Sequence, residues 1–179
     1  MNFIIFDLEA TCWLGHPPHG HNEVIEIGAY KINGYGEVTD KFSHFIKPTI
    51  NPILSDFCKS LTSIKQEEVD RAKVFPKVIN EFQDWIDTDN NYKLCCWGKF
   101  DITLLKNDCK LHKLEDDWLD ENMNLKNQYH EIKGEHKLGG LKNTLKHEGF
   151  EFTGVHHRAI YDAENLAKIF LKYLDEWKY

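Results

Sequence analysis

Two carboxylates at the end of the first apolar run are the side chains best suited to chemistry in this chain. Asp7 and Glu9 follow the apolar residues 3–6. Residues two apart in a strand point to the same side, so this pair shares a face. Two adjacent acids repel each other unless a cation lies between them. Because Mg²⁺ and similar hard ions prefer oxygen ligands, the pair predicts a metal site at the end of a buried strand.

Two more acids follow elements that would carry them toward the same place. Asp101 comes directly after the apolar run 92–97, and Asp162 lies in the first turns of the last predicted helix. Each has a plainer alternative. Asp101 is also a favoured residue for a helix N-cap, and Asp162 is also a favourable partner for a helix N-terminus.

A histidine five residues before Asp162 supplies a candidate general base. Within one helix, residues five apart diverge by roughly 140°, so we expect His157 in the loop before the helix, folded back over the acids. Near pH 7 its neutral form can accept a proton from a water molecule. His156 is a competing candidate that chemistry alone does not exclude. Carboxylates, divalent ions and a base together predict metal-assisted hydrolysis of a phosphodiester.

The totals set limits on the kind of protein. The chain has 179 residues, which suits one compact domain over 1–179, and no apolar run approaches the roughly 20 residues that span a bilayer. Its five cysteines show no framework spacing, which predicts reduced thiols and a cytoplasmic location. The net charge of −7 argues against a general nucleic-acid coat protein, but not against an enzyme whose acids bind metal.

The hydrophobic patterns predict a mixed α/β sheet flanked by helices. Ser63 and Gln66 have the spacing of a capping box. Strands are expected at 2–8, 23–32, 37–46 and 92–97, with a hairpin turn at Asn33–Gly34. Helices are expected at 56–60, 63–70, from Pro76 through Ile86, at 101–112, at 138–147 and from about Arg158, the last with an apolar stripe that reaches Trp177.

Four short motifs in this order resemble the DEDDh 3′–5′ exonucleases. They are the segments 6–12, 23–29 and 97–101, and the pair His157-x₄-Asp162. Segments 45–48, 51–58 and 61–72 are similar to the KapD and ERI-type branch, whose better-known members trim RNA. The resemblance runs from residue 3 to about 170.

The resemblance implies a fold, a cofactor and roles for single residues. The fold is an RNase H-like mixed sheet of five strands, the first three antiparallel. Two Mg²⁺ or Mn²⁺ ions are implied, with Asp7 bridging both, Glu9 and Asp162 completing the site of the attacking water, and Asp101 holding the second ion. His157 takes the proton. The implied contacts to the terminal nucleotide are Leu8, Thr11 and Trp97.

The implied reaction is removal of nucleoside 5′-monophosphates from the 3′ end of single-stranded RNA or DNA, with RNA favoured. A protein partner would supply additional substrate affinity, and no membrane is involved. Two alternatives stay open. One is a regulatory or binding protein of the KapD type that uses the fold without catalysis. The other is a phosphodiesterase for dinucleotides.

Overall fold

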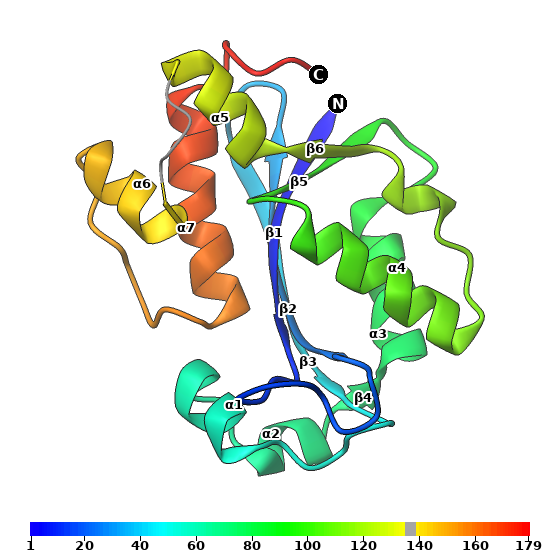
Figure 1. Cartoon of the computed structure of the whole chain (residues 1–179). Coiled ribbons are helices and arrows are strands. Elements are labelled where there is room, and N and C mark those ends of the chain that lie inside the picture. The colour runs from blue at the N-terminus through cyan, green and yellow to red at the C-terminus, as the bar shows by residue number, and fades with distance from the viewer. Residues whose placement is uncertain (135–138) are drawn as a thin grey trace.

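A mixed sheet in the order β4-β3-β2-β1-β5-β6 runs through the computed structural model, which describes residues 1–134 and 139–179 (Figure 1). β1, β2 and β3 are antiparallel neighbours, whereas β5 is parallel to β1, β6 to β5 and β4 to β3. The strands are β1 (Asn2–Ala10), β2 (Val24–Asn33), β3 (Val38–Lys47), β4 (Lys73–Val74), β5 (Tyr92–Cys96) and β6 (Asn122–Asn124).

The predicted mixed sheet with three antiparallel strands is confirmed, but the prediction of five strands is wrong. The described part of the chain forms a six-stranded sheet. The strands that the hydrophobic pattern missed, β4 and β6, are two and three residues long. Such short edge strands carry no readable alternation of polar and apolar residues.

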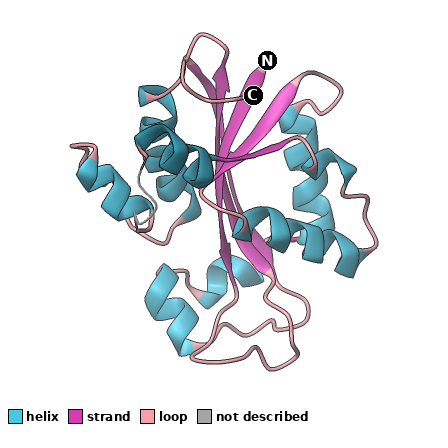
Figure 2. Cartoon of the chain, turned by 45° about the horizontal axis from the view of Figure 1, so that its top comes forward, coloured by secondary structure: helices cyan, strands magenta, loops and turns pink. Residues whose placement is uncertain are grey.

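Helices cover both faces of the sheet (Figure 2). In Figure 1, α3 and α4 lie on one side, α5, α6 and α7 lie on the other, and α1 and α2 lie near the carboxyl end of β1. The helices are α1 (Asp56–Thr62), α2 (Gln66–Asp70), α3 (Phe75–Ile86), α4 (Phe100–His112), α5 (Leu125–Lys133), α6 (Leu141–His147) and α7 (Ala159–Lys172), with a 3₁₀ turn η1 (Asp117–Leu119).

The central strand β1 is apolar on both faces because it separates two cores. Ile4, Phe6 and Leu8 pack with the residues of α3 and α4, while Phe3 and Ile5 pack with those of α7. Successive side chains of a strand alternate between faces. Asp7 and Glu9 therefore continue the row of Phe3 and Ile5, on the side where α7 lies.

Two local predictions need comment. The hairpin at Asn33 is confirmed, and the Asn33 side chain accepts hydrogen bonds from the amides of Tyr35 and Glu37. The capping box is wrong: Ser63 ends α1 with a positive φ, and the Lys65 amide donates to Glu68. Ser63 therefore caps the C-terminus of α1, and the N-cap of α2 is Lys65.

Two helix predictions differ from the structure. α5 was not expected, because its nine residues carry few apolar side chains. The helix expected over 138–147 is observed as Leu141–His147, and its first expected residue lies outside the described part. Within the described residues, no helix combines the length and apolar character needed to cross a membrane.

Candidate active site

Three of the predicted acids meet where β1 and α7 come together. One carboxylate oxygen each from Asp7, Glu9 and Asp162 lies within 4.8 Å of the other two. Asp7 and Glu9 come from the carboxyl end of β1, and Asp162 comes from the first turn of α7. Within the described residues this is the grouping of His, Cys, Asp and Glu that fits a metal ion. An all-oxygen donor set of this kind suits Mg²⁺ or Mn²⁺.

Gly28 lets α7 approach the sheet closely enough to deliver Asp162. This glycine pairs with Asp7 in the β1–β2 ladder. A Cβ at position 28 would lie 2.1 Å from the backbone nitrogen of Ile160 and 2.3 Å from the carbonyl carbon of Ala159. No side chain fits in that space. The glycine in segment 23–29 is thus explained by backbone contact with α7.

Glu26, on β2, holds the start of α7 in place. It pairs with Glu9 in the same ladder and is only 1% exposed. Its carboxylate accepts hydrogen bonds from Arg158 Nε and Nη2, at 3.2 and 3.0 Å, and from the Ala159 amide at 3.0 Å. A buried carboxylate needs such compensation. The guanidinium also lies 5.0 Å from the Phe45 ring centroid. These contacts position the loop that carries the two histidines.

The acids hold their charges at a cost in the absence of a cation. Burial raises the pKa of Asp7 well above its ordinary value, and the neighbouring carboxylates of Asp101, Asp162 and Glu9 raise it further. Burial, with repulsion from Asp162 and Glu26, raises the pKa of Glu9 to about 8. Burial also raises the pKa of Asp162 to about 6. A cation between the carboxylates would remove this penalty.

Asp101 lies next to this trio rather than within it. It is 6% exposed and sits in the first turn of α4. Burial raises its pKa to about 7, while hydrogen bonds from its own amide and that of Leu8 act in the opposite direction. The alternative in which Asp101 caps α4 is wrong, because the N-cap is Lys99. Asp162, in contrast, does interact with its helix start, since it accepts a hydrogen bond from the Arg158 amide at 3.1 Å.

Both candidate histidines lie in the turn before α7. Their ring centroids are 3.9 Å apart, and His157 adopts a left-handed backbone conformation with φ of 63°. His156 Nε2 is 3.6 Å from an Asp162 carboxylate oxygen. Burial lowers the pKa of both rings, and Lys142 lowers both further. Each is therefore neutral, and able to accept a proton, near pH 7.

The residues predicted to contact the terminal nucleotide are largely buried. Leu8 is 5% exposed and packs in the core. Thr11 is fully buried, and its hydroxyl accepts a hydrogen bond from the Glu23 amide. Trp97 packs against the core beside Tyr129, with ring centroids 5.8 Å apart. Their contact with substrate stays a prediction.

One exposed aromatic residue beside the acids was missed in the sequence. Phe100 directly precedes Asp101, and 62% of its surface is exposed. Single exposed apolar side chains are common on protein surfaces, so the interest of Phe100 lies in its position next to Asp101. The sequence signal was its place next to Asp101, but nothing in the pattern showed that the ring faces solvent.

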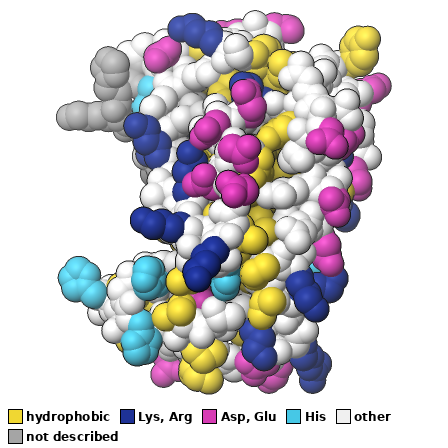
Figure 3. Space-filling view, turned by 90° about the vertical axis from the view of Figure 1, so that its right-hand side faces the viewer, with side chains coloured by type: hydrophobic (Ala, Val, Ile, Leu, Met, Phe, Trp, Pro, Cys, Tyr) yellow, Lys and Arg dark blue, Asp and Glu magenta, His cyan; other side chains and the backbone are white. Residues whose placement is uncertain are grey.

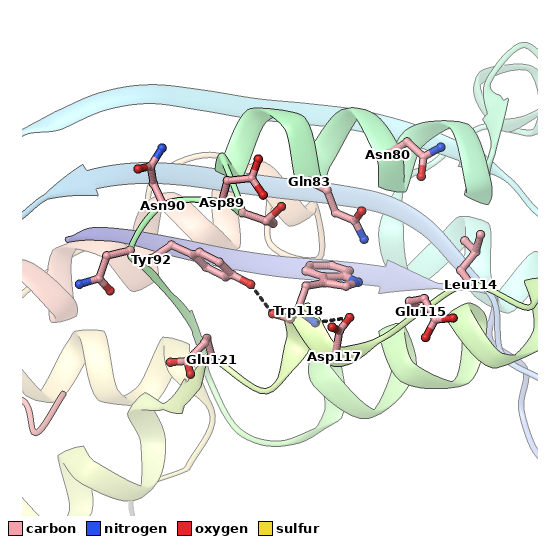
Figure 4. Close-up of a pocket in the computed structure, with 12 residues that line it drawn as sticks. Asn80, Gln83, Asp89, Asn90, Tyr92, Leu114, Glu115, Asp117, Trp118 and Glu121 are labelled. Carbon is pink, nitrogen blue, oxygen red and sulfur yellow. Dashed lines mark hydrogen bonds between the residues drawn. The ribbon is translucent and has the colours of Figure 1, made fainter.

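A separate hollow lies away from these acids. It lies between α3, the start of β5 and the segment 114–121 (Figure 4). Carboxylates of Asp89, Glu115, Asp117 and Glu121 line it, together with Trp118. Acidic side chains also gather on this side of the molecule in Figure 3. Such a lining repels phosphates, so the hollow is unsuited to a nucleic-acid chain.

Comparison with known proteins identifies the family. Residues 4–170 match the Exonuclease family model, RNase_T. The chain belongs to this family. It is 33% identical to human 3′-5′ exoribonuclease 1 over 96% of its own length and 52% of that protein. It is 30% identical to the probable 3′-5′ exonuclease KapD of Bacillus subtilis, over 94% of this chain and 82% of that one.

Solved structures agree with this assignment. The nuclease domain of 3′hExo, a DEDDh family member bound to rAMP, superposes with a TM-score of 0.91 and 32% identity, covering 97% of this chain and 92% of that domain. The DEDDh resemblance and the RNase H-like fold class are thereby confirmed. The chain spans about half the length of the first curated relatives that it matches.

Proposed function

We propose that this chain is a metal-dependent 3′–5′ exonuclease that shortens single-stranded nucleic acid, preferably RNA, and releases nucleoside 5′-monophosphates. The observation that carries the proposal is the meeting of Asp7, Glu9 and Asp162 within 4.8 Å, beside two neutral histidines. The relatives support it, since human 3′-5′ exoribonuclease 1 and KapD are both named as 3′-5′ nucleases.

The residues present fit two Mg²⁺ or Mn²⁺ ions. Asp7, Glu9 and Asp162 offer carboxylate oxygens from two elements, and burial raises the pKa of each, so a bound cation would stabilise their charged forms. Asp101 adds a fourth acid for the second ion. When bound, such ions lower the pKa of a water nucleophile and stabilise charge on the phosphate and the leaving 3′ oxygen.

The chain's own groups would complete the reaction. In the proposed assignment, His157 accepts the proton of the attacking water, because a neutral imidazole is available beside Asp162. Lys142, which lies close enough to lower the pKa of both histidines, supplies positive charge for the substrate phosphates. Glu26 and Arg158 hold the loop in place. The exposed ring of Phe100 offers a surface on which a base stacks.

The relatives also support proposals on the substrate, and the chain itself supports proposals on domain organisation and location. One solved relative recognises a histone mRNA stem-loop, and another is bound to rAMP, which favours RNA here as well. We also propose that residues 1–179 act as one catalytic domain, that a protein partner adds substrate affinity, and that the five free cysteines reflect a cytoplasmic location.

A length ladder tests the function. 5′-labelled RNA and DNA of several lengths are incubated with the protein and Mn²⁺, and products are resolved at single-nucleotide steps. The proposal expects labelled chains that shorten progressively, faster for RNA than for DNA. Cleavage of dinucleotides alone would favour the phosphodiesterase, and binding without cleavage would favour the regulatory protein.

A further inference from the structure

Two cysteines lie side by side just beyond the acids. Cys12 follows the carboxyl end of β1 by two residues, and Cys58 belongs to α1. Cys58 is fully buried in an apolar cluster formed with Ile25, Leu54, Ile64 and Val69, and Cys12 packs on this cluster while keeping partial exposure. Cys12 is therefore partly exposed, whereas Cys58 is shielded from solvent.

Hydrogen bonds hold the pair together. The Cys12 thiol and the Cys12 amide both hydrogen-bond to the sulfur of Cys58. Cys58 Sγ lies 3.6 Å from the carbonyl oxygen of Ala10. Ser55 fixes both backbones, because its hydroxyl donates to the Cys12 carbonyl at 2.6 Å and accepts from the Cys58 amide at 3.0 Å. The two thiols are thus held in contact by the fold.

The pair differs in reactivity from the other cysteines. The hydrogen bond from Cys12 lowers the pKa of Cys58 to about 7, despite burial. Burial raises the pKa of Cys95, Cys96 and Cys109, which stay protonated. The same hydrogen bond raises the pKa of Cys12, so Cys58 is the sulfur that ionises near neutral pH. Because the thiolate is the nucleophile, the adjacent pair is better suited to oxidation than the other three cysteines.

We propose that Cys12 and Cys58 are a dithiol site that a peroxide converts into an intrachain disulfide, and that this disulfide reversibly lowers nuclease activity. The regulatory part rests on the function proposed above. In the first step the thiolate of the pair attacks one peroxide oxygen, the O–O bond breaks, and a sulfenic acid and one water form. The second sulfur then displaces the hydroxyl as another water. Two thiols lose their hydrogens and one peroxide becomes two waters.

Formation of the disulfide would affect the acids through the short stretch of backbone that joins Cys12 to Glu9. An S–S bond of about 2.0 Å draws Cys12 closer to α1 than a hydrogen bond does. Only Ala10 and Thr11 separate Cys12 from Glu9, and Thr11 is tied by its amide and its hydroxyl to Glu23. The β1–β2 register is already irregular between Glu9 and Ala10. Displacement at Cys12 is therefore passed to Glu9, where a shift of about 1 Å costs up to roughly 100-fold in rate.

Peptide mapping together with a rate assay tests the proposal. The full chain is treated with hydrogen peroxide, the peroxide is removed with catalase, and free thiols are alkylated before digestion and mass spectrometry. We expect a peptide pair joined through Cys12 and Cys58, with Cys95, Cys96 and Cys109 alkylated. Degradation of 5′-labelled RNA, assayed with Mn²⁺ added after catalase, should fall at least about tenfold and return with dithiothreitol.

The matched variant is Cys12→Ser, which keeps a hydroxyl in place of the thiol. It should degrade RNA at the wild-type rate before and after peroxide. The proposal is overturned if no joined peptide forms, if Cys12→Ser loses activity to the same extent, or if the joined protein keeps its full rate. If the reduced wild type degrades no RNA, the nuclease assignment fails, whereas the mapping still decides whether the dithiol forms a disulfide.

Discussion

Four carboxylates gathered near the carboxyl end of the central strand β1 are the least favourable feature at the scale of single residues. Asp7, Glu9, Asp101 and Asp162 all have raised pKa values, and burial is the largest cause for each. Stability alone would not select such a cluster, because a carboxylate without compensating charge disfavours the folded state. The cluster is explained if the folded protein uses it to bind cations.

Replacement of Asp101 by Asn tests its role directly. The side chain keeps its shape and its hydrogen-bonding capacity but loses its charge, so we expect the fold to stay intact while activity falls by at least about 100-fold, the order seen when one group that stabilises transition-state charge is lost. Circular dichroism and rates on labelled RNA measure the two effects. Wild-type turnover would show that its carboxylate takes no part in the reaction.

The two histidines are separated by a pair of alanine variants. General-base assistance is worth about 10²–10⁴-fold, so His157→Ala should lower the single-turnover rate on that order and leave oligonucleotide binding unchanged. Burial lowers the pKa of His157, so the wild-type rate should rise with pH through a midpoint below about 6.5. His156→Ala should retain that rise.

The comparison is needed because His156 also lies close to Asp162. If His156→Ala is the inactive variant, the base is His156 and the assignment moves by one residue. If both variants turn over at the wild-type rate, neither histidine is the base.

At the scale of elements, the site depends on how closely α7 lies on β1 and β2. Gly28→Ala tests this contact, because its Cβ would lie 2.1 Å from the Ile160 nitrogen. The backbone of α7 cannot move aside as a flexible side chain does, so we expect the variant to lose about 1–3 kcal/mol of stability. We also expect it to lose activity, because Asp162 would be displaced. Gly34→Ala is the control, since its nearest neighbour would be 3.8 Å away. Equal melting temperatures for the two variants would contradict the account.

The sequence pattern predicted the helices and strands of this site better than the contacts between them. Strand β1, the hairpin and the acids were readable, because a continuous apolar run, a turn dipeptide and a pair of carboxylates leave local signals. The contact of Gly28 with α7 and the link from Glu26 to Arg158 join residues 132 positions apart in sequence, and no local pattern encodes them. The short strands β4 and β6 and the polar helix α5 were missed because they carry too few apolar residues.

At the scale of the whole molecule, the acid cluster links stability to pH and to metal. A raised pKa in the folded state means that the folded protein holds more protons than the unfolded chain. The contribution of Glu9 to the free energy of unfolding is therefore lost as pH rises from about 4.5 to about 8. Metal-free Asp7→Asn should therefore melt above the wild type, by a margin that grows from pH 5.5 to pH 8. Thermal unfolding in EDTA measures this margin.

Added Mn²⁺ should reverse the order of the two proteins. Binding to the folded state raises stability with metal concentration, and the wild type has the more complete site. At pH 8 the wild type should gain in melting temperature on addition of Mn²⁺, while Asp7→Asn gains little. A metal-independent wild type, or an Asp7→Asn margin that shrinks as pH rises, would show that the carboxylates are not arranged for cations.

The central claim is that these carboxylates bind cations that cleave nucleic acid from a free 3′ end. It is tested most directly with one RNA sequence prepared in linear and circular forms, incubated with the protein and Mn²⁺ and followed by gel and by nucleotide analysis. The account predicts that the linear form is converted to nucleoside 5′-monophosphates, that the circle survives, and that EDTA stops the reaction. Rapid cleavage of the circle, or degradation that persists after exhaustive EDTA treatment, would contradict it.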